Sequence, residues 1–271
     1  MRVALTIAGS DSSGGAGIQA DLKTFHQFGV FGTSAITAIT AQNTQGVARW
    51  QAVDADLVRA QIDAVVSDMH PSAVKSGMLA DESIIRTVAD SLREHRLGSY
   101  VLDPVMVATS GDLLIEGQAV RAIRDELIPL ATLVTPNGDE AEVLTGIALT
   151  GEDDMRRAAE AIAALGARAV LIKGGHVDSD ASTVTDILYD GEVSVFVHSR
   201  ISTTSTHGTG CTLSAAIAAQ LANGLSLRES VSSAIDYVHA AIASAPGLGS
   251  GHGPLNHFAL GSSSTKARTR D

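Results

Sequence analysis

The fold is set by a stretch near the start of the chain that reads Val3-Ala4-Leu5-Thr6-Ile7-Ala8-Gly9-Ser10-Asp11-Ser12-Ser13-Gly14-Gly15-Ala16-Gly17. Its apolar first half predicts a buried strand, and its glycine-rich second half ends that strand sharply. Beyond it, Ile18, Leu22 and Phe25 recur at helical spacing, and Gly29 follows the predicted helix at 18–28. The order of strand, glycine loop and helix is the repeating unit of an α/β protein.

The same alternation continues along the chain. Helices are predicted at 56–69, 83–95, 118–127 and 153–165, and strands at 34–41, 73–78, 99–106, 132–135 and 169–173. Strands 184–189 and 193–197 form a hairpin about Asp190-Gly191. Ser226-x-x-Glu229 caps a last helix, which Pro246 ends. We expect an α/β fold of three layers, with a mostly parallel sheet between helices, in one domain at 1–260 followed by a mobile tail at 261–271.

Composition excludes several classes of function. The formal net charge is -11, and aromatic residues make up 3% of the chain, so neither a basic surface nor stacking platforms for nucleic acid are expected. No apolar run reaches membrane-spanning length, and the start of the chain is too short in apolar length for a signal peptide. A single cysteine is typical of a reducing compartment. We therefore expect a cytoplasmic protein without membrane or nucleic-acid partners.

A second glycine-rich loop, Thr206-His207-Gly208-Thr209-Gly210-Cys211-Thr212, runs into an alanine-rich helix. Unpaired backbone N–H groups and the positive end of the helix dipole meet there, and the loop carries no acidic side chain. This pattern predicts a phosphate site, although a plain glycine turn before a packed helix would look the same. The P-loop and the dinucleotide-binding glycine pattern are both absent.

Polar residues follow several of the predicted strands, where ligands bind in parallel α/β sheets. They are Gln42, Lys75, Asp103, Asn137, Glu140 and Lys173. The oxygens of Asp103 and Glu140 are ligands that Mg²⁺ prefers, and Lys173 could neutralise phosphates. Two plainer interpretations stay open: Glu140 as a carboxylate in the first turn of a helix, and Lys173 as an exposed strand end. By helical spacing, Asp21 lies on a solvated surface.

The sequence resembles the hydroxymethylpyrimidine/phosphomethylpyrimidine kinases of thiamine biosynthesis, within the ribokinase-like superfamily. The resemblance covers residues 3–259 in collinear order. It rests on eight stretches: Leu5 to Thr24, Ala41-Gln42-Asn43-Thr44, Gly77-Met78-Leu79, Leu102-Asp103-Pro104-Val105-Met106, Thr135-Pro136-Asn137-Gly138-Asp139-Glu140-Ala141, Lys173-Gly174-Gly175-His176, Thr206 to Ala216, and Gly251-His252-Gly253-Pro254-Leu255-Asn256-His257-Phe258.

The resemblance implies ATP-dependent phosphorylation of hydroxymethylpyrimidine and then of its monophosphate, with Mg²⁺, in a homodimer. It also implies roles for individual residues. The substrate-binding residues are Asp21, Gln42, Met78 and Val105; the anion hole and catalytic group are Gly208, Gly210 and Cys211; the nucleotide-binding residues are Asn137, Lys173 and Thr209; the metal-binding residues are Asp103 and Glu140. The implied role of Asp21 replaces its interpretation as a surface carboxylate.

Two features of the resemblance need an explanation. Sugar kinases of the superfamily have an aspartate base where this chain has Cys211, so we expect the helix N-terminus to lower the thiol pKa, or the thiol to act by positioning alone. The family usually has a lysine where this chain has Thr109, which puts in doubt one contact to the nucleotide phosphates. The alternatives are a pyridoxal or pyridoxine kinase of the same superfamily, and a non-catalytic small-molecule binder.

Overall fold

The computed structural model describes residues 1–106, 117–177, 182–259 and 268–269. Thr109 and most of the expected tail lie outside these residues. The strands are β1 (Val3–Ser10), β2 (Phe31–Asn43), β3 (Gly46–Ala52), β4 (Ala73–Ser76), β5 (Tyr100–Leu102), β6 (Leu133–Val134), β7 (Val170–Ile172), β8 (Thr183–Tyr189), β9 (Val193–Ser199) and β10 (Arg268–Thr269). Within the described ranges they form one sheet in the order β10-β9-β8-β7-β6-β5-β4-β1-β2-β3.

The sheet is mixed, so the prediction of a mostly parallel sheet is wrong. The six neighbouring strands in the middle of the sheet all pair in parallel, in the order β7-β6-β5-β4-β1-β2. At the edges, β3 pairs with β2, and β8, β9 and β10 continue the sheet, all antiparallel. For β2–β3 and β8–β9 the physical reason is a short connection, because a short turn can return the chain only antiparallel, whereas a parallel partner needs a crossover, usually a helix. Strand β10 joins β9 antiparallel from much later in the chain, after α7 and α8.

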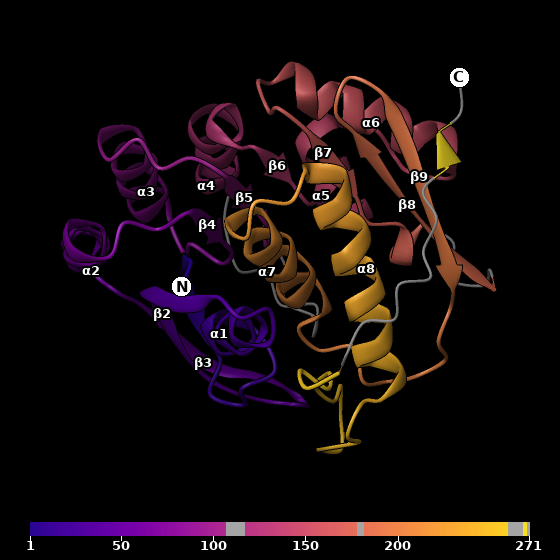
Figure 1. Ribbon diagram of the computed structural model, residues 1–271, viewed down its shortest axis with the longest axis horizontal. Coiled ribbons are helices and arrows are strands. Elements are labelled where there is room, and N and C mark those ends of the chain that lie inside the picture. Colours follow the sequence, from indigo (N-terminus) through magenta and orange to yellow (C-terminus); the bar gives the residue numbers. More distant parts are fainter. Residues whose placement is uncertain (107–116, 178–181, 260–267, 270–271) are drawn as a thin grey trace.

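Helices cover both faces of the sheet, as predicted (Figure 1). One face carries α2 (Ala55–Asp68), α3 (Glu82–Glu94), α4 (Gly117–Ala122), α5 (Gly138–Thr145) and α6 (Glu152–Ala164). A π-helical turn at Ile123–Leu127 and a 3₁₀ turn at Ile128–Leu130 extend α4, and Gly174–His176 is a further 3₁₀ turn. The other face carries α1 (Gly17–Gln27), α7 (Thr209–Ala222) and α8 (Leu227–Ala243).

The alternation of side chains along β1 divides the hydrophobic core in two. Leu5 and Ile7 join the cluster on the α2–α6 side, whereas Ala4 joins the cluster around α7. Helix α7 is buried almost all round, from Thr212 to Ala219. Its small alanine side chains let it pack closely between the sheet and α1 and α8. The core thus fixes the start of α7, where the predicted phosphate loop lies.

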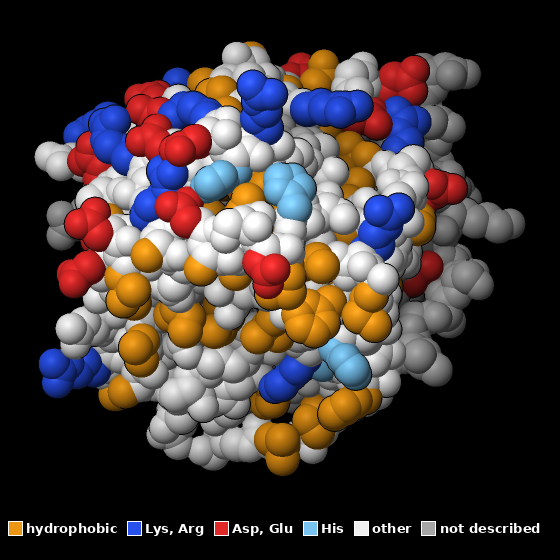
Figure 2. All heavy atoms as spheres, turned by 60° about the vertical axis from the view of Figure 1, so that its left-hand side comes forward, with side chains coloured by type: hydrophobic (Ala, Val, Ile, Leu, Met, Phe, Trp, Pro, Cys, Tyr) orange, Lys and Arg blue, Asp and Glu red, His pale blue; other side chains and the backbone are white. Residues whose placement is uncertain are grey.

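One side of the molecule carries exposed hydrophobic side chains among its charged ones. Figure 2 shows a band of hydrophobic side chains there, and Ile39, Trp50 and Leu57, on β2, β3 and α2, are exposed by 60%, 38% and 57%. Across the described ranges, none of the helices has both the length and the apolar character needed to cross a membrane.

Candidate active site

A cavity of about 640 Å³ opens beyond the carboxyl ends of β1, β5 and β7, in front of the first turn of α7. All the predicted site residues except Asp21 line it: Gln42, Met78, Asp103, Val105, Asn137, Glu140, Lys173, Gly208, Thr209, Gly210 and Cys211. The position agrees with the rule that parallel α/β sheets bind ligands at this edge.

The loop before α7 can adopt its conformation only with glycine at its centre. Gly208 precedes the helix with φ +82°, and a Cβ added there would lie 1.9 Å from the carbonyl oxygen of Gly15. A Cβ at Gly210 would lie 3.2 Å from Lys173 Nζ and 3.6 Å from Asp103 Oδ2. The N–H groups of the first helical turn therefore lie beside a partly buried cation, an arrangement that suits a phosphate.

Lys173 lies between two carboxylates at the cavity wall. Its Nζ is 3.1 Å from Asp103 Oδ1 and 3.7 Å from Glu140 Oε2. Burial by itself lowers the pKa of Lys173, but the two carboxylates outweigh it and hold that pKa above its usual range. Burial raises the pKa of Glu140 to about 7, with Lys173 opposing the rise. Two carboxylates and one ammonium leave an excess of negative charge when all three are ionised.

Glu140 also has a structural function. Asn137 and Glu140 form a capping box at the start of α5, in which Glu140 Oε2 accepts the N–H of Asn137 at 2.7 Å and Asn137 Oδ1 accepts the N–H of Glu140 at 2.9 Å. The interpretation of Glu140 as a first-turn carboxylate is therefore correct. Its proximity to Lys173 adds a second function to the same side chain.

The donor set fits Mg²⁺ of the kind that proteins hold jointly with a nucleotide. In the part of the chain that the structure describes, no group of three or more His, Cys, Asp or Glu side chains could hold a metal by itself. Magnesium, however, commonly takes one or two carboxylates, with phosphate oxygens and water completing its coordination. Asp103 and Glu140 supply two hard oxygen donors, and their excess negative charge favours a cation.

Asp21 does not line the cavity, and its contact with substrate stays a prediction. Its side chain is fully buried outside the cavity wall, where Lys75 Nζ donates to its two carboxylate oxygens at 2.9 and 3.0 Å. Thr6 Oγ1 also donates to it, at 2.5 Å. Burial raises the pKa of Asp21 against the opposing effect of Lys75. Lys75, one of the polar residues expected at a strand end, is equally buried.

Cys211 faces the cavity at the start of α7, but the expected lowering of its pKa is wrong. Burial raises the pKa of the thiol to about 11, although the Lys75 ammonium and the backbone N–H of Gly17 act in the opposite direction. The cost of placing a thiolate in a desolvated position exceeds what the helix N-terminus supplies. The thiol is therefore protonated at neutral pH.

Sequence reasoning missed several cavity residues. Asp11 and His207 line the cavity near Gln42, and Asp186, His198 and Arg200 line it beside the β8–β9 hairpin. Asp11 and His207 could have been found, because each is a polar residue inside a glycine-rich loop. The other three lie in a segment whose alternating pattern indicates only a hairpin, and nothing in that pattern shows which way the strands face.

A helix N-terminus for an anion, a lysine and two carboxylates on one wall of a cavity in an α/β fold define a small-molecule phosphotransferase. A family model described as phosphomethylpyrimidine kinase matches residues 11–256. The chain is 55% identical over 261 residues to the hydroxymethylpyrimidine/phosphomethylpyrimidine kinase of Rhizobium meliloti (strain 1021), a match that covers 94% of this chain and 97% of that protein. The chain therefore belongs to the phosphomethylpyrimidine kinase family.

Two further similarities extend this result. The thiamine biosynthesis bifunctional protein ThiED of Geobacter sulfurreducens is 51% identical over 255 residues, which cover 94% of this chain and 52% of that protein. A solved structure of Bacillus subtilis pyridoxal kinase in complex with ADP superimposes with a TM-score of 0.88 at 42% identity, covering 96% of this chain and 98% of that one.

Proposed function

We propose that the protein transfers a phosphoryl group from ATP to 4-amino-5-hydroxymethyl-2-methylpyrimidine and then to the monophosphate so formed, as a step of thiamine biosynthesis. One observation carries the proposal. Gly208, Thr209, Gly210 and Lys173 line the same cavity as Gln42, Met78 and Val105. Family membership and the names of the relatives support the same substrate.

In the first transfer, the hydroxymethyl oxygen forms a bond to the γ-phosphorus while the bond from that phosphorus to ADP breaks and the hydroxyl proton leaves. The N–H groups at the start of α7 stabilise the charge on the moving group, with Gly208, Thr209 and Gly210 shaping the loop. Lys173 neutralises the nucleotide phosphates. Mg²⁺, held by Asp103 and Glu140 together with those phosphates, would supply further charge neutralisation.

Cys211 fits a positioning role in this reaction better than the role of a base. Its thiol is protonated at neutral pH because burial raises its pKa. Phosphoryl transfer passes through a loose transition state and therefore asks little of a base. We expect the thiol to hold the substrate hydroxyl in line with the γ-phosphorus while the proton leaves late.

Gln42, Met78 and Val105 would form the pyrimidine end of the cavity. A carboxamide can both donate to and accept from the aminopyrimidine ring, and the two apolar side chains suit its faces.

In the same proposal, residues 1–260 form one ribokinase-like domain in the cytoplasm. The exposed apolar side formed by Ile39, Trp50 and Leu57 supports a homodimer.

The test is to incubate the protein with ATP, Mg²⁺ and the hydroxymethylpyrimidine and to identify the products by mass. We expect addition of one phosphate and then a second, and loss of both products with EDTA. A single phosphate would limit the proposal to the first step. ATP hydrolysis without a phosphorylated pyrimidine would refute it.

A further inference from the structure

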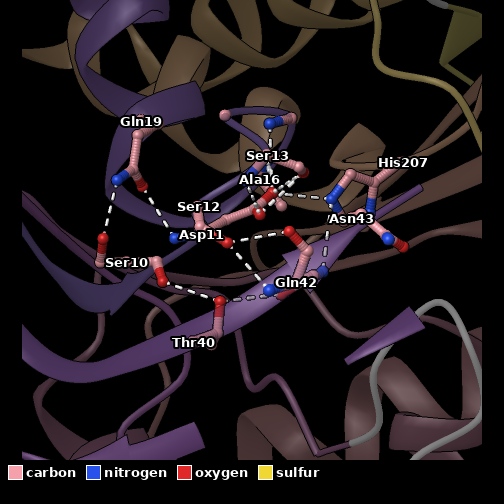
Figure 3. A network of polar contacts seen from close by, with 12 residues as sticks. Ser10, Asp11, Ser12, Ser13, Ala16, Gln19, Thr40, Gln42, Asn43 and His207 are labelled. Carbon is pink, nitrogen blue, oxygen red and sulfur yellow. Dashed lines mark hydrogen bonds and ion pairs between the residues drawn. The ribbon is translucent and has the colours of Figure 1, made fainter. Parts of the chain in front are cut away.

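Asp11 is the centre of a buried polar network that joins two loops of the cavity (Figure 3). Its side chain is 4% exposed. The carboxylate accepts the backbone N–H groups of Ser13, Gly15 and Ala16 at 2.8, 3.1 and 2.8 Å. It also lies 2.8 Å from Nε2 of His207, the residue directly before Gly208. One carboxylate thus organises the loop after β1 and holds the anion loop.

The contact between Asp11 and His207 fixes where the imidazole carries a proton. Burial raises the pKa of Asp11, but the hydrogen bonds from His207, Ser13 and Ala16 outweigh it and bring the pKa to about 2. An ionised carboxylate only accepts hydrogen bonds, so Nε2 of His207 must donate. That nitrogen is therefore held by the protein and is not available to take a proton from a substrate.

The two loops also lie close together at Gly15 and Gly208. A Cβ added to Gly15 would lie 2.4 Å from His207 Cδ2, and a Cβ added to Gly208 would lie 1.9 Å from the carbonyl oxygen of Gly15. The two loops therefore lie so close together that neither position has room for a side chain. The Asp11–His207 pair prevents the anion loop from moving away.

The network continues to the pyrimidine end of the cavity. Ser12 Oγ accepts the N–H of Gln42 and donates to its carbonyl oxygen, each at 2.8 Å. The side chain of Gln42 accepts from Thr40 Oγ1 at 3.2 Å and lies 3.4 Å from His207 Nε2. Because His207 Nε2 donates to Asp11, its approach to the Gln42 amide nitrogen is a close contact and not a hydrogen bond, and Gln42 is held by Ser12 and Thr40 beside the histidine that precedes the phosphate loop.

We propose that Asp11 and His207 are positioning residues that hold the anion loop at a fixed distance from the pyrimidine end, so that the substrate hydroxyl and the γ-phosphoryl group meet in line. The proposal rests on the proposed function for its kinetic consequence. Neither residue needs to touch the reacting atoms. Because misplacement by about 1 Å can lower a rate about 100-fold, loss of the pair is expected to lower kcat far more than it raises KM.

The kinetic test uses D11N, H207A, H207Q and the double variant D11N/H207A. We expect D11N and H207A to lower kcat about 10- to 100-fold, with KM for the pyrimidine within about threefold of the wild-type value. Because the amide of glutamine can donate to Asp11 as the imidazole does, H207Q is expected to recover most of the loss. The double variant is expected to be no slower than the slower single variant, as the pair acts as a unit.

H257A is the matched control. His257 is as buried as His207 and contacts α7 through Thr212 Oγ1 at 3.2 Å, but it lies outside the network of Asp11. A loss of kcat in H257A equal to that in H207A would overturn the proposal, because any lost histidine under α7 would then have the same effect. Additive losses in the double variant would overturn it as well.

Amide hydrogen exchange of a peptide spanning 206–212 tests the structural part without catalysis. We expect D11N and H207A to exchange at least about tenfold faster than the wild type there, and H257A to match the wild type. Unchanged exchange in D11N and H207A would refute the positioning role. A wild-type protein that phosphorylates no pyrimidine, yet shows these exchange differences, would refute the proposed function and leave the pair as the holder of the loop.

Discussion

The thiol of Cys211 is subject to two opposing physical effects. The N-terminus of α7, the N–H of Gly17 and the Lys75 ammonium all favour a thiolate, whereas burial disfavours it. The sequence indicates the effect of the helix N-terminus, because it places the cysteine in the first turn of a predicted helix. It does not show how strongly the folded chain will desolvate the thiol at the cavity wall.

Alkylation of Cys211 by iodoacetamide tests this balance directly, because the chain has no other cysteine. With a pKa of about 11, the thiol is expected to react slowly at pH 7.5 and progressively faster up to about pH 11. The same chain unfolded in urea is the control and is expected to titrate near an ordinary thiol. A folded protein whose reaction rate levels off below pH 8 would contradict the raised pKa.

Asp21, which the family resemblance implies to bind substrate, forms a buried ion pair with Lys75. Both side chains have no exposed surface and bind each other. Replacing Lys75 by methionine leaves a carboxylate buried without its counter-charge, so we expect K75M to lower the free energy of unfolding by about 3–5 kcal/mol. The D21L/K75M double variant is expected to recover part of this loss in urea unfolding. If D21N instead raised KM for the pyrimidine without any loss of stability, the result would support a direct contact between Asp21 and the substrate.

At the scale of the elements, hydrophobic periodicity predicted most helices and strands within a few residues. It works for α2, α3 and α6 because each has one apolar face, and for β1 because both of its faces are buried. The capping box at Ser226 is confirmed. Strand β3 was missed because most of it is exposed at the edge of the sheet. Helix α5 was anticipated only through Glu140 as a first-turn carboxylate, because eight residues give too short a pattern for its bounds.

The site residues that could be predicted are those that directly follow a recognisable strand. Asp103, Asn137, Glu140 and Lys173 follow strands that were recognised, so the sheet brings them to one wall. The residues of the β8–β9 hairpin could not be placed, because their approach to α8 depends on packing between distant segments. The position of Asp11 in the site could not be predicted, because it depends on two glycine loops that are far apart in the sequence and lie against each other in the fold.

Gly208→Ala tests whether the anion loop depends on its backbone conformation. Gly224→Ala is the matched control, since Gly224 also has a positive φ, +92°, but a Cβ there would meet nothing within 4 Å. G224A is expected to cost about 1 kcal/mol in stability and to keep its activity. G208A would push the loop off the carbonyl of Gly15 and is expected to lower kcat about 100-fold or more. Equal kinetic effects of the two substitutions would rule out this explanation.

At the scale of the whole molecule, stability should depend on pH through His257, which lies under α7. Burial, with a smaller effect of Lys23, lowers the pKa of His257 to about 4, against 6.5 in an unfolded chain. The unfolded state therefore binds more protons between pH 6.5 and 4, so the stabilisation present above pH 6.5 is lost as the pH falls to 4. Relative to H257Q, the wild type is expected to lose about 3 kcal/mol between pH 7.5 and pH 4 in urea unfolding. Parallel losses in both proteins would show that other groups are responsible.

The mixed sheet and the helices on its two faces place one cavity in front of the anion loop, and a solved pyridoxal kinase shares this fold. Pyridoxal and the hydroxymethylpyrimidine are both flat heteroaromatic rings with a hydroxymethyl group, so shape alone distinguishes them poorly. The discriminating contacts in our proposal are those of Gln42, Met78 and Val105.

The most direct measurement is a competition in one tube, with ATP, Mg²⁺ and equal concentrations of the hydroxymethylpyrimidine and pyridoxal. The initial ratio of the phosphorylated products, measured by mass, equals the ratio of the two kcat/KM values. We expect the pyrimidine products to exceed pyridoxal phosphate at least about tenfold, a difference of about 1.4 kcal/mol in transition-state binding. A mixture dominated by pyridoxal phosphate would contradict the proposed substrate while leaving the anion loop and its phosphoryl chemistry in place.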